Sequence, residues 1–290
     1  MARRSEGVTG GDRFATLAAM PSARSPLRLA ILVTSALLGA CEAREEADQA
    51  ARAPVVVDKE SSPEVLPAPA LDRAALLDAV ADAASAHAAG SDDSKAQAAL
   101  DGRRFAVKLR FGCGGPAGEA STDALRWRVK SDESLEITAT PDLSLDAPEL
   151  TGALTQTVEA VEGFWIARPW LFSDACPAMP KAAQAPTAAA AAAERSVGIA
   201  QYYTPEGSRT ERRSGRAYVS LAPIEPGAPL PQDGFFLLLE GRLQAWPGGK
   251  PIHCSTSVAG ARPACIVSVR FDRVAFTRPG DGEVIDEWTN

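Results

Sequence analysis

Residues 235–246 read Phe-Phe-Leu-Leu-Leu-Glu-Gly-Arg-Leu-Gln-Ala-Trp, and they form one of the two longest candidate strands in the chain. The first five residues are all apolar, and polar and apolar residues alternate after them. A strand that is apolar on both faces is typical of the centre of a sheet, where other layers cover both sides. We therefore expect this segment to run through the middle of the fold.

Alternation with a period of two marks further strands on both sides of this segment. The phase slips at Asp272 and Arg273 in the last long pattern, which predicts a β-bulge there. The second and third patterns are separated by a short turn and should form a hairpin. These patterns predict a mainly β fold, a sandwich or barrel of about nine strands, with candidate strands at residues 105–111, 125–130, 135–137, 161–167, 197–204, 217–221, 251–255, 265–277 and 283–288.

One N-terminal helix is predicted over residues 71–90. Asp72 is placed to cap its first turn, and Gly90 is placed to end it. The apolar side chains that recur at helical spacing are Leu76, Leu77, Val80 and Ala84.

The strands fall into two groups, a first β half at residues 95–180 and a second at residues 196–290. An alanine-rich stretch at residues 181–195 separates them and is interpreted as a linker. Whether the two halves share one core is left open by the sequence.

The N-terminal region has the layout of a secretory signal. Arg24 and Arg28 provide positive charge around the start of a ten-residue apolar core at residues 29–38, too short to span a bilayer. The core ends in Leu38-Gly39-Ala40-Cys41, which resembles the lipobox of bacterial lipoprotein precursors. The resemblance implies that residues 1–40 are removed and that Cys41 is lipidated. Translation is expected to begin at Met20, because residues 1–19 form an unusually long polar leader.

The same resemblance implies a cellular location. In that family aspartate after the cysteine is the usual signal for retention in the inner membrane, whereas this chain has Glu42. We therefore expect a protein anchored by lipid in the outer membrane and facing the periplasm. Residues 41–70 contain the lipidated cysteine and a proline-rich segment that buries too little to fold, so they are predicted to form a disordered tether.

The composition of the chain limits the classes of partner that it can bind. The chain has 290 residues and a formal net charge of −7, with 30 basic and 37 acidic residues. Residues 1–41 hold five of the basic and two of the acidic residues, so the mature part carries 25 against 35, a net charge near −10. Nucleic acid is excluded as a partner, because its binding needs a basic surface. No apolar run after Cys41 approaches the ~18 residues that indicate a transmembrane helix.

Four cysteines remain for the folded part, Cys113, Cys176, Cys254 and Cys265. Their even number and the oxidising compartment predict two disulfides. Of the three possible pairings we favour Cys254 with Cys265, which bracket ten residues between a short strand and a long one. Cys113 then pairs with Cys176 by elimination. Both bridges are interpreted as structural, because Cys-x-x-Cys is absent.

Most catalytic chemistries lack residues to support them. A Ser-His-acid triad needs a histidine, and His253 is the only one in the strand-rich region, next to a disulfide cysteine. Too few nitrogen and sulfur ligands remain for a zinc site once the cysteines are paired. The glycine-rich residues 112–116 lack the Lys and Ser or Thr of a phosphate-binding loop and are interpreted as a turn. We predict no metal, no cofactor and no enzymatic activity, although two carboxylates of a glycosidase stay possible, with Glu240, Asp272, Asp286 and Glu287 as candidates.

The clearest binding candidate is the connection at residues 205–216. It holds four arginines, whose planar guanidinium groups suit carboxylates and phosphates. The alternative is a solvated hairpin loop, with Glu206 and Glu211 balancing the charge. The four arginines are Arg209, Arg212, Arg213 and Arg216.

Three functions follow from these observations. The first is a non-catalytic accessory or structural role in the envelope through binding of a protein partner, with the arginine loop as the contact. The second is a module that binds envelope glycan or lipopolysaccharide through exposed tryptophans and the same arginines. The third is a hydrolase with paired carboxylates. Exposure of the tryptophans distinguishes the second, and the residues to inspect are Trp165, Trp170, Trp246 and Trp288.

Overall fold

The structure is a computed structural model. It describes residues 68–131, 133–166, 171, 173–176, 195–207, 212–213, 215–257 and 260–290. The predicted signal peptide, Cys41, most of the tether and most of the alanine-rich linker lie outside the described residues. All described elements belong to one compact unit, Pro63–Asn290.

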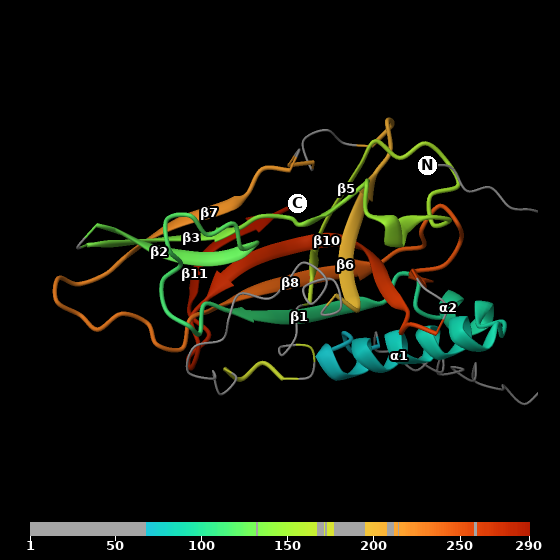
Figure 1. Ribbon diagram of the computed structural model, residues 1–290, viewed down its shortest axis with the longest axis horizontal. Helices are drawn as coiled ribbons and strands as arrows, with labels where there is room; N and C mark the ends of the chain where they lie inside the picture. The colour runs from blue at the N-terminus through green and yellow to red at the C-terminus, as the bar shows by residue number, and fades with distance from the viewer. Residues whose placement is uncertain are drawn as a thin grey trace, which may run out of the picture. The chain divides into compact units, whose positions relative to one another are not determined.

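The fold is mainly β, as predicted, and Figure 1 shows its arrangement. Among the described residues, eleven strands form an eight-stranded sheet and a three-stranded sheet. The prediction of about nine strands missed β4, which has two residues and therefore shows no period. The strands are β1 Arg104–Phe111, β2 Leu125–Ser131, β3 Ser134–Ala139, β4 Leu143–Ser144, β5 Ala160–Trp165, β6 Val197–Tyr203, β7 Tyr218–Pro223, β8 Phe235–Leu243, β9 Ile252–Ser255, β10 Ala264–Thr277 and β11 Val284–Thr289, and a 3₁₀ turn, η1, covers Pro148–Leu150.

Strand β8 lies inside the large sheet between β1 and β10. Its first five residues are all buried, because Leu237 and Leu239 face the main core while Phe236 and Leu238 lie on the other face. The ring of Phe236 is covered by Arg110, whose guanidinium lies 4.6 Å from the ring centroid. The strand ends at Leu243 rather than at residue 246, since the backbone N–H of Trp246 donates to the carbonyl of Lys250 in a turn.

The two β halves interleave and share one core. Strand β1 pairs with β8, β3 with β7 and β5 with β6, so each pairing joins a strand before residue 180 to one after residue 196. The hairpin of β2 and β3 is confirmed, and with β7 it forms the three-stranded sheet. This sheet packs over the large one (Figure 1), with the Trp127 and Phe235 ring centroids 5.9 Å apart.

Strand β10 joins two parts of the large sheet. Residues 265–267 lie between β6 and β9, and residues 273–277 lie between β8 and β11. The predicted bulge is confirmed: Phe271 is opposite Gly241 and Arg273 is opposite Glu240, which leaves Asp272 unpaired. The backbones approach closely here, because a Cβ on Gly241 would lie 2.0 Å from the carbonyl oxygen of Arg270. The bulge bends β10 at the place where its neighbours change.

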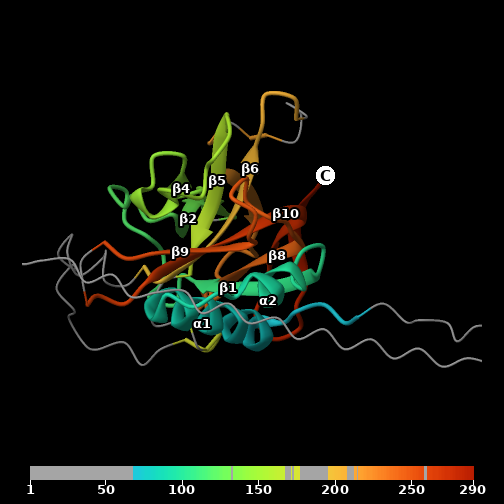
Figure 2. The same cartoon turned by 90° about the vertical axis from the view of Figure 1, so that its right-hand side faces the viewer.

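The predicted helix is confirmed as α1, Arg73–Ala89. The Asp72 carboxylate accepts a hydrogen bond from the N–H of Ala75, and Gly90 ends the helix with φ 61°. The buried residues are Leu76, Val80 and Ala83, whereas Leu77 and Ala84 are only partly buried. A second helix, α2 Ser94–Ala98, has five residues and shows no periodic signal in the sequence. Figure 2 shows α1 and α2 below β1 and β8.

Both predicted disulfides are present, Cys113–Cys176 and Cys254–Cys265. Cys254 and Cys265 are directly opposite each other in the β9–β10 pair, with their Cα atoms 4.0 Å apart. Within the described part of the chain, no helix is both long and apolar enough to cross a membrane.

Candidate functional site

The candidate site lies where β10 changes its neighbour along one edge. This edge is paired with β6 at residues 265–268 and with β11 from Arg273 onward. Between these two paired stretches, side chains form the hydrogen bonds of the Phe271 backbone. Its N–H donates to Gln201 Oε1 at 2.9 Å, and its carbonyl accepts from Asn290 Nδ2 at 2.7 Å. Two amide side chains thus replace a strand at this point, and a cavity opens beside them.

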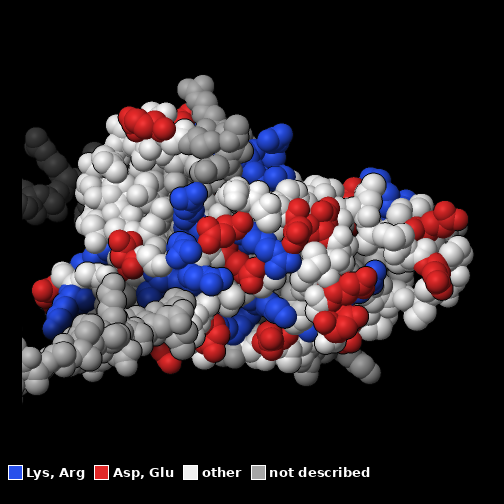
Figure 3. Space-filling view, turned by 180° about the vertical axis from the view of Figure 1, so that it is seen from behind, with Lys and Arg blue, Asp and Glu red and all other residues white. Residues whose placement is uncertain are grey.

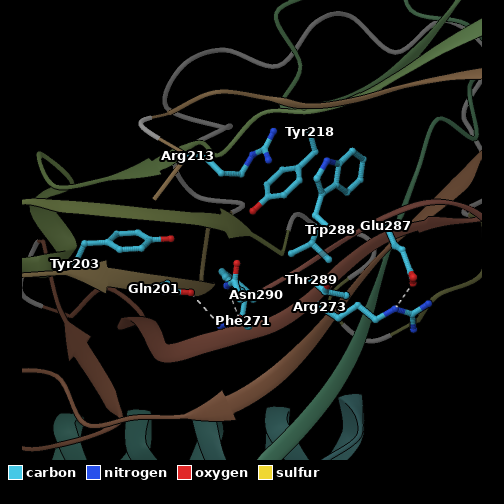
Figure 4. A pocket seen from close by; sticks show the side chains of 11 residues that line it. Gln201, Tyr203, Arg213, Tyr218, Phe271, Arg273, Glu287, Trp288, Thr289 and Asn290 are labelled. Carbon is cyan, nitrogen blue, oxygen red and sulfur yellow. Dashed lines mark hydrogen bonds and ion pairs between the residues drawn. The ribbon is translucent and has the colours of Figure 1, made fainter. Parts of the chain in front are cut away.

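The cavity has a volume of about 340 Å³ and is shown in Figure 4. This volume is near the lower end of the roughly 300–1,000 Å³ of small-molecule sites. Tyr203, Tyr218 and Trp288 supply aromatic surface, and the polar lining includes Gln201, Arg213 and Asn290. Planar polar groups and aromatic rings therefore face one space that fits a small ligand.

The aromatic wall is held by edge-to-face packing. The Tyr218 and Trp288 centroids are 5.0 Å apart at 74°, and the Phe276 and Trp288 centroids are 5.3 Å apart at 85°. Such geometry is favourable for aromatic pairs. Burial raises the pKa of Tyr218 to about 12, against the opposing effect of the nearby Arg213. The Tyr218 hydroxyl is therefore protonated at neutral pH and can donate a hydrogen bond.

Arg213 lies over this wall. Its guanidinium carbon is 4.1 Å from the Tyr218 centroid, and Nη2 donates to the carbonyl of Ala217 at 2.9 Å. The loop is fixed by the buried carboxylate of Glu162, which accepts from the N–H of Arg213 at 3.3 Å and from the N–H of Gly215 at 2.8 Å. An acidic side chain of β5 therefore sets the position of Arg213 at the cavity.

The other loop arginines are placed differently. Arg212 forms an ion pair with Glu159 at 2.7 Å. Arg216 is exposed, and its Nε donates to the carbonyl of Arg213 at 3.0 Å. Arg209 lies outside the described residues. The structure thus brings Arg213 into the cavity but does not unite the four arginines in one site.

The tryptophans also differ in burial and in position. Trp127, Trp165 and Trp246 are buried, and the indole N–H groups of Trp127 and Trp246 donate to backbone carbonyls at 3.1 and 3.2 Å. Trp170 lies outside the described residues. Among the tryptophans that the structure describes, Trp288 is the one that is half-buried and lines the cavity.

Three of the four candidate acids of a hydrolase are engaged with arginines, whereas Asp286 accepts a hydrogen bond from the N–H of Glu287. Glu240 and Glu287 both contact Arg273, at 3.0 and 2.7 Å, and Asp272 lies 3.8 Å from Arg242. In the described lining of the cavity, Glu287 is the only acid. A mechanism with two cooperating carboxylates therefore finds no pair in this cavity.

The histidines have structural contacts. His253 Nε2 lies 3.0 Å from the carbonyl oxygen of Thr151, and burial lowers the pKa of His253. His87 Nε2 lies 3.2 Å from the Thr256 hydroxyl. Over the described ranges, no group of three or more His, Cys, Asp or Glu side chains could hold a metal ion.

Several site residues carried no sequence signal. Gln201, Tyr218 and Asn290 are single residues in or beside strands, and Glu162 resembles any other acid of a strand pattern. Comparison with known proteins found no matching family model, curated protein or solved structure. The cavity itself is therefore the basis for a functional assignment.

Proposed function

We propose that this chain is a non-catalytic lipoprotein of the bacterial outer membrane whose periplasm-facing β domain binds an envelope glycan in the cavity beside Trp288. One observation carries the proposal: an aromatic wall, an arginine and two amide side chains converge on one space of about 340 Å³. The apolar face of a sugar ring packs on aromatic rings, while its hydroxyl groups need a few well-placed hydrogen-bond partners.

Arg213 refines the ligand class. Its guanidinium is a donor suited to carboxylate or phosphate oxygens. Because it already donates to Ala217, an anionic ligand would add to an arginine whose position is fixed. An acidic or phosphorylated sugar is therefore favoured over a neutral one.

Catalysis is not part of the proposal. The carboxylate of Glu287 in the cavity is paired with Arg273 at 2.7 Å, and cleavage by paired acids requires a second carboxylate. Binding needs none of these groups to change protonation state.

A second candidate function, binding of a protein partner, is favoured by strand β7. Among the described strands β7 pairs with β3 alone, and its exposed face carries Val219 and Leu221, which are 47% and 62% exposed. An unpaired strand edge can accept an extended segment of another protein. This candidate places the protein contact at β7 rather than at the arginine loop, because Val219 and Leu221 are exposed whereas Arg212 is paired with Glu159.

The test is titration of the chain from residue 42 with fragments of cell-wall glycan and of the lipopolysaccharide core, followed by NMR of the tryptophan indole N–H signals. We expect the Trp288 signal to shift, while the buried Trp127 and Trp246 signals stay in place. Trp288→Leu should weaken binding by about three- to tenfold, the range expected for loss of one aromatic contact.

Trp165→Phe is the matched control, because Trp165 lies in a separate apolar cluster away from the cavity. Glycan binding that is equally strong in both variants would refute the cavity as the site. Binding of a protein that Leu221→Lys abolishes, with no glycan binding, would instead select the β7 function.

A further inference from the structure

Two side-chain amides fill the gap between the strands that pair with one edge of β10. β6 pairs with this edge as far as Ser268, and β11 pairs with it from Arg273 onward. In the gap, Gln201 Oε1 accepts from the N–H of Phe271, and Asn290 Nδ2 donates to the carbonyl of the same residue. We call Gln201 and Asn290 the amide pair, and Figure 4 shows both beside the Phe271 backbone.

The Phe271 backbone fixes the orientation of both amides. A backbone N–H donates to an oxygen and a backbone carbonyl accepts from an N–H, so neither side-chain amide can turn over without losing its bond. Gln201 therefore keeps Nε2, with its two N–H donors, for another partner, and Asn290 keeps the acceptor Oδ1. Within the residues that the structure describes, neither Nε2 nor Oδ1 has a hydrogen-bond partner.

The amide pair is held in place before a ligand arrives. Gln201 belongs to β6 and is 4% exposed. The backbone N–H of Asn290 donates to the carbonyl of Asp272, the bulged residue of β10, at 3.2 Å. Both members line the cavity, so they present a donor and an acceptor to one space. Groups that are positioned in advance lose less conformational freedom when a ligand binds.

A secondary amide is the chemical complement of this pair, because it carries one carbonyl acceptor and one N–H donor. An ammonium group has donors alone and would leave the Gln201 donors without an acceptor. A hydroxyl group offers a single oxygen for both roles. An acetyl amide also brings a methyl group, for which the rings of Tyr218 and Trp288 provide apolar surface in the same cavity.

An extended peptide also carries secondary amides, but the gap is too short for one. Residues 269–272 alone separate the stretch of β10 paired with β6 from the stretch paired with β11, and Asp272 lies in the bulge. A strand of the usual length, about five or six residues, would have to displace β6 or β11. An acetamido group on a sugar needs no such length.

Surface charge gives little selection of its own. On the face shown in Figure 3, basic and acidic side chains lie next to one another across the middle of the described surface. Attraction of an anionic glycan over a distance depends on a region of one sign. Recognition of a particular sugar therefore depends on the groups inside the cavity.

We propose that the amide pair recognises the acetamido group of an N-acetylated sugar. The ligand carbonyl accepts from Gln201 Nε2, and the ligand N–H donates to Asn290 Oδ1. This inference rests on the proposed glycan function and names the substituent that the cavity selects. Arg213 lines the same cavity and suits an acidic substituent on the same sugar.

The test uses one cell-wall disaccharide fragment in three forms: native, with its N-acetyl groups removed, and chemically re-acetylated. Each form is titrated into the chain from residue 42, which contains the whole compact unit, and the side-chain amide signals of Gln201 and Asn290 are followed by NMR. We expect both signals to shift with the native and re-acetylated forms. The form without acetyl groups should bind at least about tenfold more weakly, because the buried Gln201 donors then lose their acceptor.

The matched variants are Gln201→Glu and Gln232→Glu. Glutamate at position 201 keeps an oxygen for the Phe271 N–H but removes the two donors, so binding of the native fragment should weaken by about tenfold or more. Gln232→Glu adds the same charge at an exposed position and should leave binding unchanged. Unshifted indole signals of the buried Trp127 and Trp246 show that each variant is folded, and the three sugar forms decide the question if Gln201→Glu is not.

Equal binding of the native and de-acetylated forms would overturn the proposal but leave the glycan function in place. Binding of the lipopolysaccharide core without binding of the native fragment would have the same meaning. Failure of both glycans to bind would refute the proposed function itself. Binding of an acetylated dialanine amide in place of the sugar would also overturn the proposal and would assign the amide pair to a peptide.

Discussion

Replacing Gln201 by methionine tests whether a side chain substitutes for a strand beside β10. Methionine has a similar length and is apolar, so the substitution removes the acceptor without leaving a large void. The N–H of Phe271, which Gln201 Oε1 accepts at 2.9 Å, would then be buried without a partner, since Phe271 is 5% exposed. An unsatisfied buried donor costs about 1–3 kcal/mol, and this is the expected loss in the free energy of unfolding.

The assay is urea unfolding followed by tryptophan fluorescence, with linear extrapolation to water. Gln232→Met is the control, because Gln232 is exposed and donates only to the nearby carbonyl of Leu230. Its free energy of unfolding should change by less than about 0.5 kcal/mol, as for most surface substitutions. A change equally small for Gln201→Met would refute the reasoning, because the Phe271 N–H would then be satisfied by another acceptor.

Three further predictions concern titration and the disulfides. Burial raises the pKa of Tyr218 from 10.0 in the unfolded chain to about 12, so the stability that the buried neutral phenol contributes is complete below pH 10 and is lost as the pH rises through 12. Urea unfolding should show that Tyr218→Phe removes roughly 3 kcal/mol of the stability loss in this window. Stability curves that run parallel for both proteins would contradict this prediction. Burial lowers the pKa of His253 below 6.5, so the stability that the buried neutral imidazole contributes is present above pH 6.5 and is lost as the pH falls. His253→Gln should therefore flatten the profile of unfolding free energy between neutral and mildly acidic pH. An unchanged profile would count against burial of the neutral ring. Replacing Cys254 and Cys265 together by alanine should lower the free energy of unfolding by about 3 kcal/mol for a sequence separation of 11, measured by the same assay, and a loss below about 1 kcal/mol would contradict the loop-entropy estimate.

The tryptophans show how position in the fold changes the meaning of a residue. Four of them were candidates for stacking on a sugar, yet Trp165 and Trp246 fill a second apolar cluster on the other face of the large sheet. Trp288 instead reaches the cavity, because β11 pairs with β10 beyond the point where β6 has left it. The alternation around Trp288 predicts a strand, but it does not contain the identity of the neighbouring strand.

The arginine loop gives a similar result. Its composition predicts a site for anions, and one of its members, Arg213, does line the cavity. The loop is held there by Glu162, an acid of a strand 51 residues earlier in the chain than Arg213. The sequence offers no sign of that pairing, so the different contacts of Arg212, Arg213 and Arg216 could not be predicted from it.

Local pattern was sufficient for the strand periods, the caps of α1, the bulge at Asp272 and the mainly β class, because each depends on residues close together in the chain. Cysteine spacing and elimination were sufficient for both disulfides. Elements that are too short to repeat, β4 and α2, were invisible to the same reasoning. Strand partners were decided by packing between distant segments, since a period of two assigns each residue to a face but leaves the register and the neighbour open. The cavity beside Trp288 arises from those long-range pairings, and for that physical reason it belongs to the tertiary structure alone.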